Sequence, residues 1–213
     1  MAEISPKVSV ILCTYNRPYY LKETIASVVG QSMSNWELLV INDGGSDVGP
    51  IVEEFNDERI RYFPRRTNRG KAACCNFGLD KARAEYIAYI DDDDTWYSNH
   101  LELLSDALDE NPEAGVVYSD LYAVIYIEDR QNGRRYPLHK WISVSRDFNR
   151  AFMFETNHVL HVSLMHRKEA AVRIGGYNEH VSVLIDWNLT RKLAFIYDFI
   201  HIPQPTGEYS ASL

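Results

Sequence analysis

Blocks of apolar residues alternate with helix-type stretches over the first hundred residues of the chain. Residues 8–14 form a nearly continuous apolar run rich in β-branched side chains, which is typical of a parallel strand covered on both faces. The same pattern predicts further strands at residues 36–41, 60–63 and 86–90.

Helical spacing separates these strands. Pro18 opens the first helix, in which Leu21, Ile25 and Val28 fall at i, i+4 and i+7 and form one apolar stripe. Further helices are expected around residues 51–55, after Gly70 through residue 84, and over 101–108. The repeated strand–helix units predict an α/β fold with a Rossmann-like, mostly parallel central sheet flanked by helices.

The second half of the chain has a less regular pattern. Residues 115–126 contain strand-like stretches, residues 130–136 are expected to be a polar connection, and Gly175-Gly176 interrupts a short helix. A last helix is expected from residue 185 to near 193. The chain shows neither an internal repeat nor a linker, so residues 1–213 are expected to form a single domain.

Polar clusters follow three of the predicted strands. Thr14, Tyr15 and Asn16 end the first strand, Asp43 follows the second, and the run 91–94 follows the fourth. Parallel α/β sheets bind ligands beyond the carboxyl ends of their strands, so these clusters are expected to line one rim of the sheet.

Residues 91–94 are four successive aspartates. Adjacent like charges repel, and a hard divalent cation such as Mn²⁺ or Mg²⁺, which prefers oxygen ligands, relieves that repulsion. A solvated acidic turn is the alternative. The buried-type strand before the run and the pair Trp96-Tyr97 after it favour the metal site.

Composition narrows the class of protein. The net charge of -8 argues against a nucleic-acid partner, because binding along a phosphate backbone needs clustered Lys and Arg. The basic residues of segment 65–71 can make the electrostatic potential of this acidic chain locally positive, as nucleotide binding requires. A solvated basic loop is equally compatible with the composition. Three cysteines give neither a disulfide framework nor a zinc pattern. With no leader and no membrane span in the sequence, a cytoplasmic protein is expected, with peripheral membrane contact left open.

Several motifs in order resemble the family 2 glycosyltransferases, which have the GT-A fold, use nucleotide-activated sugars and invert the anomeric centre. The resemblance covers residues 8–193 and rests on the order and spacing of its parts. Those parts are the segments 8–17, 40–46, 68–73 with Asn76, 91–96, 174–177 and 186–187.

The resemblance implies roles for the donor-side residues. Thr14, Tyr15 and Asn16 match positions that line the nucleobase pocket, and core packing is the alternative for Tyr15. Asp43 matches the carboxylate that accepts a hydrogen bond from the base, for example from N3 of uracil, which favours a UDP-sugar. Lys71, or Arg69 in its place, is expected either to contact the diphosphate or to remain in solvent.

The Asp-x-Asp signature of the family falls on residues 91–93. Asp93 is then expected to bind the metal directly, and Asp91 or Asp92 to reach the ribose or the metal through water. Asp94 is an additional carboxylate, and a shift of the motif by one residue stays open.

The acceptor-side base is expected to be Asp186, which matches the Asp of the family's Glu-Asp pair, with Ile185 where Glu is usual. A helix N-cap is the alternative for Asp186. Trp187 is expected to stack on a sugar or to anchor its helix. His158, His161 and His166 are expected to be core or surface histidines rather than ligands.

The sequence thus favours an inverting, metal-dependent glycosyltransferase that moves a sugar from a nucleotide donor to a hydroxyl of a glycan or a lipid-linked glycan. Residues 1–98 are expected to bind the nucleotide-sugar and residues 99–213 the acceptor, either as a whole enzyme or as one domain of a longer one. Two alternatives are a sugar-phosphate nucleotidylyltransferase and a nucleotide-sugar-binding module with weak turnover. The absence of a Gly-rich basic loop after the first strand argues against the former, while Ile185 hints at the latter.

Overall fold

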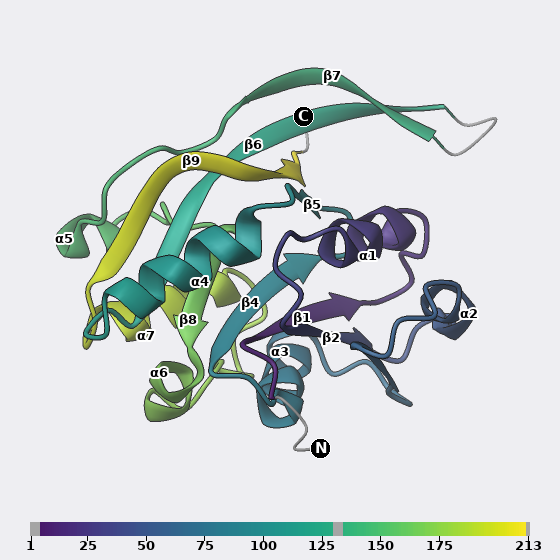
Figure 1. Cartoon of the computed structure of the whole chain (residues 1–213), viewed down its shortest axis with the longest axis horizontal. Helices are drawn as coiled ribbons and strands as arrows, with labels where there is room; N and C mark the ends of the chain where they lie inside the picture. Colours follow the sequence, from purple (N-terminus) through teal and green to yellow (C-terminus); the bar gives the residue numbers. More distant parts are fainter. Residues whose placement is uncertain (1–4, 130–133, 212–213) are drawn as a thin grey trace.

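A computed structural model describes residues 5–129 and 134–211 (Figure 1). The strands are β1 (Val8–Thr14), β2 (Trp36–Asn42), β3 (Ile60–Pro64), β4 (Tyr86–Asp91), β5 (Thr95–Trp96), β6 (Val116–Asp129), β7 (Arg134–Ile142), β8 (Leu164–Arg167) and β9 (Phe199–Ser210). The helices are α1 (Leu21–Val29), α2 (Gly49–Glu53), α3 (Lys71–Lys81), α4 (His100–Glu110), α5 (Arg150–Met153), α6 (Lys168–Arg173) and α7 (Ile185–Ala194), with a 3-10 turn at His161–Ser163.

One continuous sheet has the strand order β3-β2-β1-β4-β8-β6-β9-β5, and β7 pairs with the outer part of β6. Strands β3, β2, β1 and β4 are parallel, as the repeated strand–helix units predict. Strand β8 runs antiparallel to β4 and β6, and β9 runs parallel to β6. The predicted α/β fold class is confirmed, and the second half makes the sheet a mixed one.

Two layers of helices cover the sheet because successive strand residues point to opposite faces. Val8, Val10 and Leu12 pack with the apolar stripes of α1, α2 and α4. Ile11 and Cys13 face the other layer, which α3, α5, α6 and α7 form. Within the described residues no helix is both long enough and apolar enough to span a bilayer.

Several predicted boundaries are wrong. Residues 134–136 belong to β7 rather than to a polar connection, while residues 130–133 lie outside the described part of the chain. Helix α3 ends at Lys81 instead of near residue 84, because Ala82 takes an extended conformation. Helix α1 begins at Leu21, three residues after Pro18.

The pair Gly175-Gly176 follows α6 and does not interrupt it. Both glycines have positive φ values, +74° and +63°, which a side chain rarely adopts. A helix commonly stops where the chain turns into this left-handed region, so the pair ends α6 and turns the chain towards Tyr177.

Candidate active site

The carboxyl ends of β1, β2 and β4 meet at one rim, as expected, and surround a cavity of about 270 Å³. We call it the donor pocket, after the role that the sequence leads us to expect. The donor pocket is lined by Cys13, Thr14, Tyr15, Arg17, Asp43, Asn68, Gly70, Lys71, Cys74, Asp91 and Asp92. Six of the lining residues are ones that the sequence analysis predicts for the site: Thr14, Tyr15, Asp43, Lys71, Asp91 and Asp92. Asn16, Asp93 and Asp186 are not part of this lining.

Asp43 is buried just beyond the end of β2 and is held from several sides. Its Oδ2 accepts hydrogen bonds from the backbone N–H groups of Arg69 at 3.0 Å and Gly70 at 2.8 Å. The guanidinium of Arg65 lies 2.8 Å from Oδ1 and forms an ion pair. Arg65 thus serves the site by fixing a carboxylate of the donor pocket.

Thr14 and Asn16 shape the pocket from β1. The hydroxyl of Thr14 donates a hydrogen bond to Asp92 Oδ2 at 2.7 Å. Asn16 adopts a left-handed conformation with φ of 55°, and its Oδ1 accepts a hydrogen bond from Ser46 N at 2.9 Å. Asn16 therefore holds the turn after β2 in place by this hydrogen bond. Tyr15 lines the pocket and is 45% exposed.

Lys71 opens helix α3 and neutralises Asp91. Its ammonium donates to both carboxylate oxygens of Asp91, at 2.6 and 2.7 Å. Burial alone would raise the pKa of Asp91, but the charges of Lys71 and of the nearby His161 hold it well below its usual range. The same contact overcomes the effect of burial on Lys71 and raises the pKa of that ammonium.

The other aspartates of the run each have a different environment. Arg17 forms ion pairs with Asp92 at 3.2 Å and, more closely, with Asp93. Burial raises the pKa of Asp92 to about 6, despite the hydrogen bond from Thr14 and the charge of Arg17. The carboxylate repulsion inferred from the sequence is therefore relieved in large part by two protein cations, Lys71 and Arg17.

Strand β9 braces the end of the aspartate run. Ser210 N donates to Asp94 Oδ1 at 2.9 Å, and the Ser210 hydroxyl donates to the carbonyl oxygen of Asp93 at 2.9 Å. Burial and repulsion by Asp91 and Asp93 raise the pKa of Asp94 well above its usual range. The short strand β5 then pairs with β9, Thr95 opposite Glu208, and fixes the direction in which the run leaves β4.

The described residues contain no cluster of three or more His, Cys, Asp or Glu side chains arranged to hold a metal ion. A magnesium-type cation, however, is often bound by one or two carboxylates together with substrate phosphates rather than by a complete protein cage. Asp91 and Asp93 offer such oxygen ligands beside the donor pocket, so this donor set fits Mn²⁺ or Mg²⁺ that arrives with a diphosphate.

Asp186 lies in the first turn of α7 and lines a second cavity of about 320 Å³. We call it the acceptor pocket, after the role expected of Asp186 from the sequence. Gly70 and Lys71 line both pockets, so the two cavities adjoin at the start of α3. Asn157 Nδ2 donates to Asp186 Oδ2 at 2.9 Å and orients the carboxylate. Leu184, not Asp186, occupies the N-cap position of α7, so the helix-cap alternative is wrong.

Trp187 and the histidines have mainly structural contacts. Trp187 Nε1 donates to the carbonyl oxygen of Met153 at 2.7 Å and anchors α7 to α5. His166 is fully buried, with Tyr89 OH at 2.9 Å, and burial lowers its pKa to about 4. His161 reaches further into the site, because its Nδ1 lies 3.8 Å from Asp91 Oδ1 while Nε2 contacts Tyr177 OH at 2.8 Å.

The reasoning from sequence misses Arg17 and Asn157. It includes Arg65 in the basic segment and names His161 as a core or surface histidine, but the contacts of these two residues with Asp43 and Asp91 arise only across the fold. Arg17 alone had a local signal, since a cation directly after a strand end lies near the carboxylates of neighbouring strands. Asn157 meets Asp186 across 29 positions of sequence, which no local pattern encodes.

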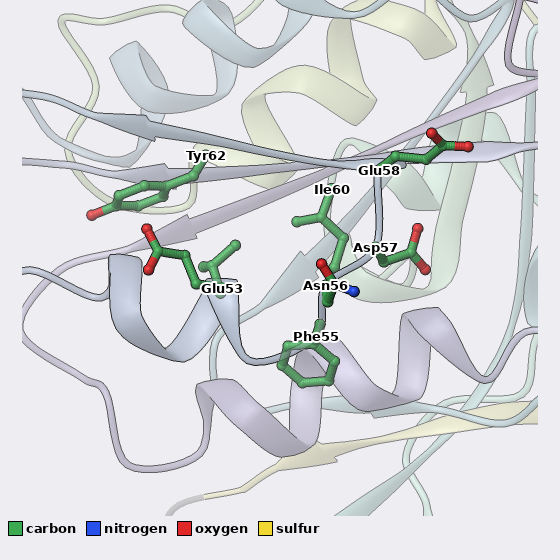
Figure 2. Close-up of a pocket in the computed structure, with 8 residues that line it drawn as sticks. Glu53, Phe55, Asn56, Asp57, Glu58, Ile60 and Tyr62 are labelled. Carbon is green, nitrogen blue, oxygen red and sulfur yellow. The ribbon is translucent and has the colours of Figure 1, made fainter.

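A larger hollow of about 890 Å³ lies away from this rim, between α2 and the edge strand β3 (Figure 2). Glu53, Asp57 and Glu58 give it an acidic lining, together with apolar groups such as Phe55 and Ile60. Its lining contains none of the predicted site residues and no cation that could bind a phosphate.

Comparison with known proteins identifies the family of the chain. Residues 9–172 match the family model described as Glycosyl transferase family 2. An uncharacterized glycosyltransferase of Bacillus subtilis, YwdF, is 28% identical over 207 residues, which are 97% of this chain and 75% of that protein. Escherichia coli WfgD, a UDP-Glc:alpha-D-GlcNAc-diphosphoundecaprenol beta-1,3-glucosyltransferase, is 39% identical over 97 residues, which are 45% of this chain and 38% of WfgD.

Among solved structures, S. aureus TarS in complex with UDP superposes with a TM-score of 0.78 over 97% of this chain, at 21% identity. The chain spans 61% of that TarS chain, and so less than two thirds of both TarS and WfgD. The likeness to TarS confirms the fold, and the family model covers well over half of the sequence. The chain therefore belongs to glycosyl transferase family 2.

Proposed function

We propose that this chain is an inverting, metal-dependent glycosyltransferase that moves a sugar from a nucleotide donor, with UDP favoured, to a hydroxyl of a glycan or lipid-linked glycan. The observation that carries the proposal is the adjacency of two pockets. The donor pocket holds Asp43, Lys71 and Asp91, and the acceptor pocket holds Asp186, with Lys71 in the wall of both.

The donor side supplies one group for each part of a nucleoside diphosphate. The exposed ring of Tyr15 can stack on the base, and Asp43 can accept a hydrogen bond from N3 of uracil. Lys71 provides the positive charge next to the diphosphate. The names of two similar proteins support the choice of UDP, since WfgD uses UDP-Glc and TarS binds UDP.

Asp93, with Asp91, would hold Mn²⁺ or Mg²⁺ together with oxygens of the diphosphate. When bound, the cation neutralises the negative charge that develops on the leaving nucleoside diphosphate. Because Lys71 and Arg17 occupy these carboxylates in this structure, part of that pairing must exchange as the donor and the cation enter.

Asp186 acts as the general base in this proposal. Its carboxylate takes the proton of the acceptor hydroxyl while the hydroxyl oxygen attacks the anomeric carbon and the bond to the diphosphate oxygen breaks on the opposite face. Asn157 holds the carboxylate in place through Oδ2. A single displacement of this kind inverts the anomeric centre.

The two halves of the chain divide this work, with residues 1–98 binding the donor and residues 99–213 shaping the acceptor site. A cytoplasmic protein that meets the membrane peripherally, alone or as part of a longer enzyme, fits a lipid-linked acceptor of the type in the name of WfgD.

Calorimetric titration of UDP and of GDP, with and without Mn²⁺, tests the donor site. We expect UDP binding that Mn²⁺ strengthens. The Mn²⁺-dependent part of the affinity should be lost in Asp93→Ala but kept in Asp80→Ala, which removes an exposed carboxylate at the far end of α3. Failure of both nucleotides to bind under every condition would refute the proposal.

Hydrolysis of UDP-sugars, measured in parallel, tests the base. Asp186→Asn should retain UDP affinity and lose turnover by about 100-fold or more, the usual contribution of a general base. Equal, very low turnover in both proteins would instead indicate a binding module. Release of pyrophosphate from UTP and a sugar 1-phosphate would indicate a nucleotidylyltransferase.

A further inference from the structure

The wall of the acceptor pocket contains a loop that is fixed to the donor side. Asn76 of α3 donates to the carbonyl oxygen of Tyr177 at 3.0 Å and to Glu179 Oε1 at 2.9 Å, and its own Oδ1 accepts from Tyr177 N at 2.8 Å. These three hydrogen bonds hold the beginning of the segment between Tyr177 and α7. Its last residue, Leu184, is held from the helix, because its carbonyl oxygen accepts a hydrogen bond from Asn188 N at 2.9 Å.

The backbone conformation at this position is unfavourable for a leucine. Leu184 has φ of 52° and ψ of 37°, in the left-handed region, where the Cβ atom of an L-residue crowds its own backbone. The other described non-glycine residues with positive φ are Asn16 and Asn56, and asparagine tolerates this region much better. Leu184 also occupies the N-cap of α7 without a side chain able to cap it.

Burial does not compensate for this strain. The side chain of Leu184 is 59% exposed, so it contributes little to the apolar core. It lines the acceptor pocket together with Asp186 of the same chain segment and with Arg69 and Lys71 of the facing segment. Folding alone would favour asparagine at this position, because asparagine accepts positive φ and caps a helix.

Strained residues persist where the surrounding structure imposes them, and they cluster at functional sites. We propose that Leu184 is a specificity-determining residue whose side chain contacts an apolar group of the acceptor, an alkyl or isoprenoid chain attached to the sugar that receives the transfer. This inference rests on the proposed function, since it assigns the acceptor to the pocket of Asp186. It narrows the acceptor class from glycans in general to glycosides with an apolar tail.

The test compares n-octyl β-D-glucoside, below the concentration at which it forms micelles, with methyl β-D-glucoside. Binding of each to the whole chain is measured by calorimetry in the presence of UDP and Mn²⁺. We expect the octyl glycoside to bind at least tenfold more tightly than the methyl glycoside. Leu184→Asn should reduce this preference to less than threefold while raising Tm by roughly 2–4 °C, since the strain is removed and a cap is added.

Two further variants separate the contact from a general change in the surface. Leu184→Met keeps an apolar side chain in the pocket and should keep the preference. Val183→Asn removes a neighbouring apolar side chain that is 70% exposed but does not line the pocket, and should change neither the preference nor Tm.

Loss of the preference in Leu184→Asn, in a protein that is more stable than the wild type, would support the inference, because a folding defect could not cause it. Equal binding of the two glycosides by the wild type, or an unchanged preference in Leu184→Asn, would overturn it. If the inference is overturned but UDP still binds, the proposed donor function stands. If UDP does not bind while the preference for the octyl glycoside depends on Leu184, the proposed function fails and the apolar subsite remains.

Discussion

Replacement of Lys71 by methionine should convert donor binding from partly to strongly metal-dependent. In the wild type, the ammonium bonds both oxygens of Asp91 and compensates a carboxylate that lines the donor pocket. In Lys71→Met, that carboxylate meets the incoming diphosphate uncompensated. The methionine retains most of the aliphatic stem, so the change is largely one of charge.

The magnitude follows from the contacts that are lost. A hydrogen bond to a charged group contributes about 1.5–3 kcal/mol, which corresponds to roughly 10- to 150-fold in affinity. We therefore expect the metal-free affinity for UDP to fall by a factor in this range. With saturating Mn²⁺ the loss should be smaller, because the freed oxygens of Asp91 become available to the cation. Stability should change by only about 0–1 kcal/mol, since the two side chains are 40% and 32% exposed.

The assay is titration of UDP at several Mn²⁺ concentrations. Arg66→Met is the matched control, because it removes the same charge from an exposed position a few residues earlier in the chain. Metal-free UDP binding equal to that of the wild type, or an equal loss in both variants, would refute a specific role of Lys71 at the diphosphate.

Three further predictions concern stability. Gly78→Ala should lower Tm by roughly 2–8 °C in calorimetry, because an added Cβ would lie 2.7–3.0 Å from three atoms of the buried Ile11. The cost of overpacking, about 1–3 kcal/mol, outweighs the helix preference for alanine. A rise in Tm would show that α3 can shift away from Ile11 without cost. His100 and His166 are buried and their pKa values are lowered to about 3 and about 4, so the unfolded chain binds more protons below pH 6.5. Stability is then nearly complete above about pH 7.5 and should fall by about 2 kcal/mol per histidine between pH 7.5 and pH 5, measured by urea unfolding. His100→Gln should flatten this dependence. Trp187→Phe removes the hydrogen bond to Met153 and should destabilise the chain by about 1 kcal/mol in urea without altering UDP affinity; a large loss of UDP binding would mean that the ring touches a ligand.

The first half of the fold could be predicted because each element there carries its own signal. The apolar runs of β1 and β4 are buried on both faces, and the stripe of α4 at Leu101, Leu104 and Leu108 is buried as its spacing predicts. Ligands bind at the carboxyl ends of parallel strands, and from this rule we predict that Thr14, Asp43 and Asp91 lie together. All three line the same pocket.

The second half could not be predicted in the same way, because its strands owe their existence to partners distant in sequence. Strand β7 is exposed along most of its length and is defined by pairing with β6, so its residues lack the alternation of a half-buried strand. Strand β9 contains Pro203, Pro205 and Gly207, which locally argue against a strand. Pairing with β6 and β5 nevertheless makes this segment a strand, in spite of its prolines and glycine. Shifts in the register between β6 and β9 accommodate these residues.

The bracing of the aspartate run by β9 has a consequence for biosynthesis. The run and Ser210 are separated by more than a hundred positions, so Asp93 and Asp94 leave the ribosome long before the strand that supports them. Strands β1 to β4 pair with one another early in the sequence and can do so while synthesis continues, whereas the other edge of β4 waits for β8. The nascent chain can therefore pair β1 to β4 first, and the carboxylates that would take a divalent cation in the proposed function are set in their final positions only after β9 has been synthesised.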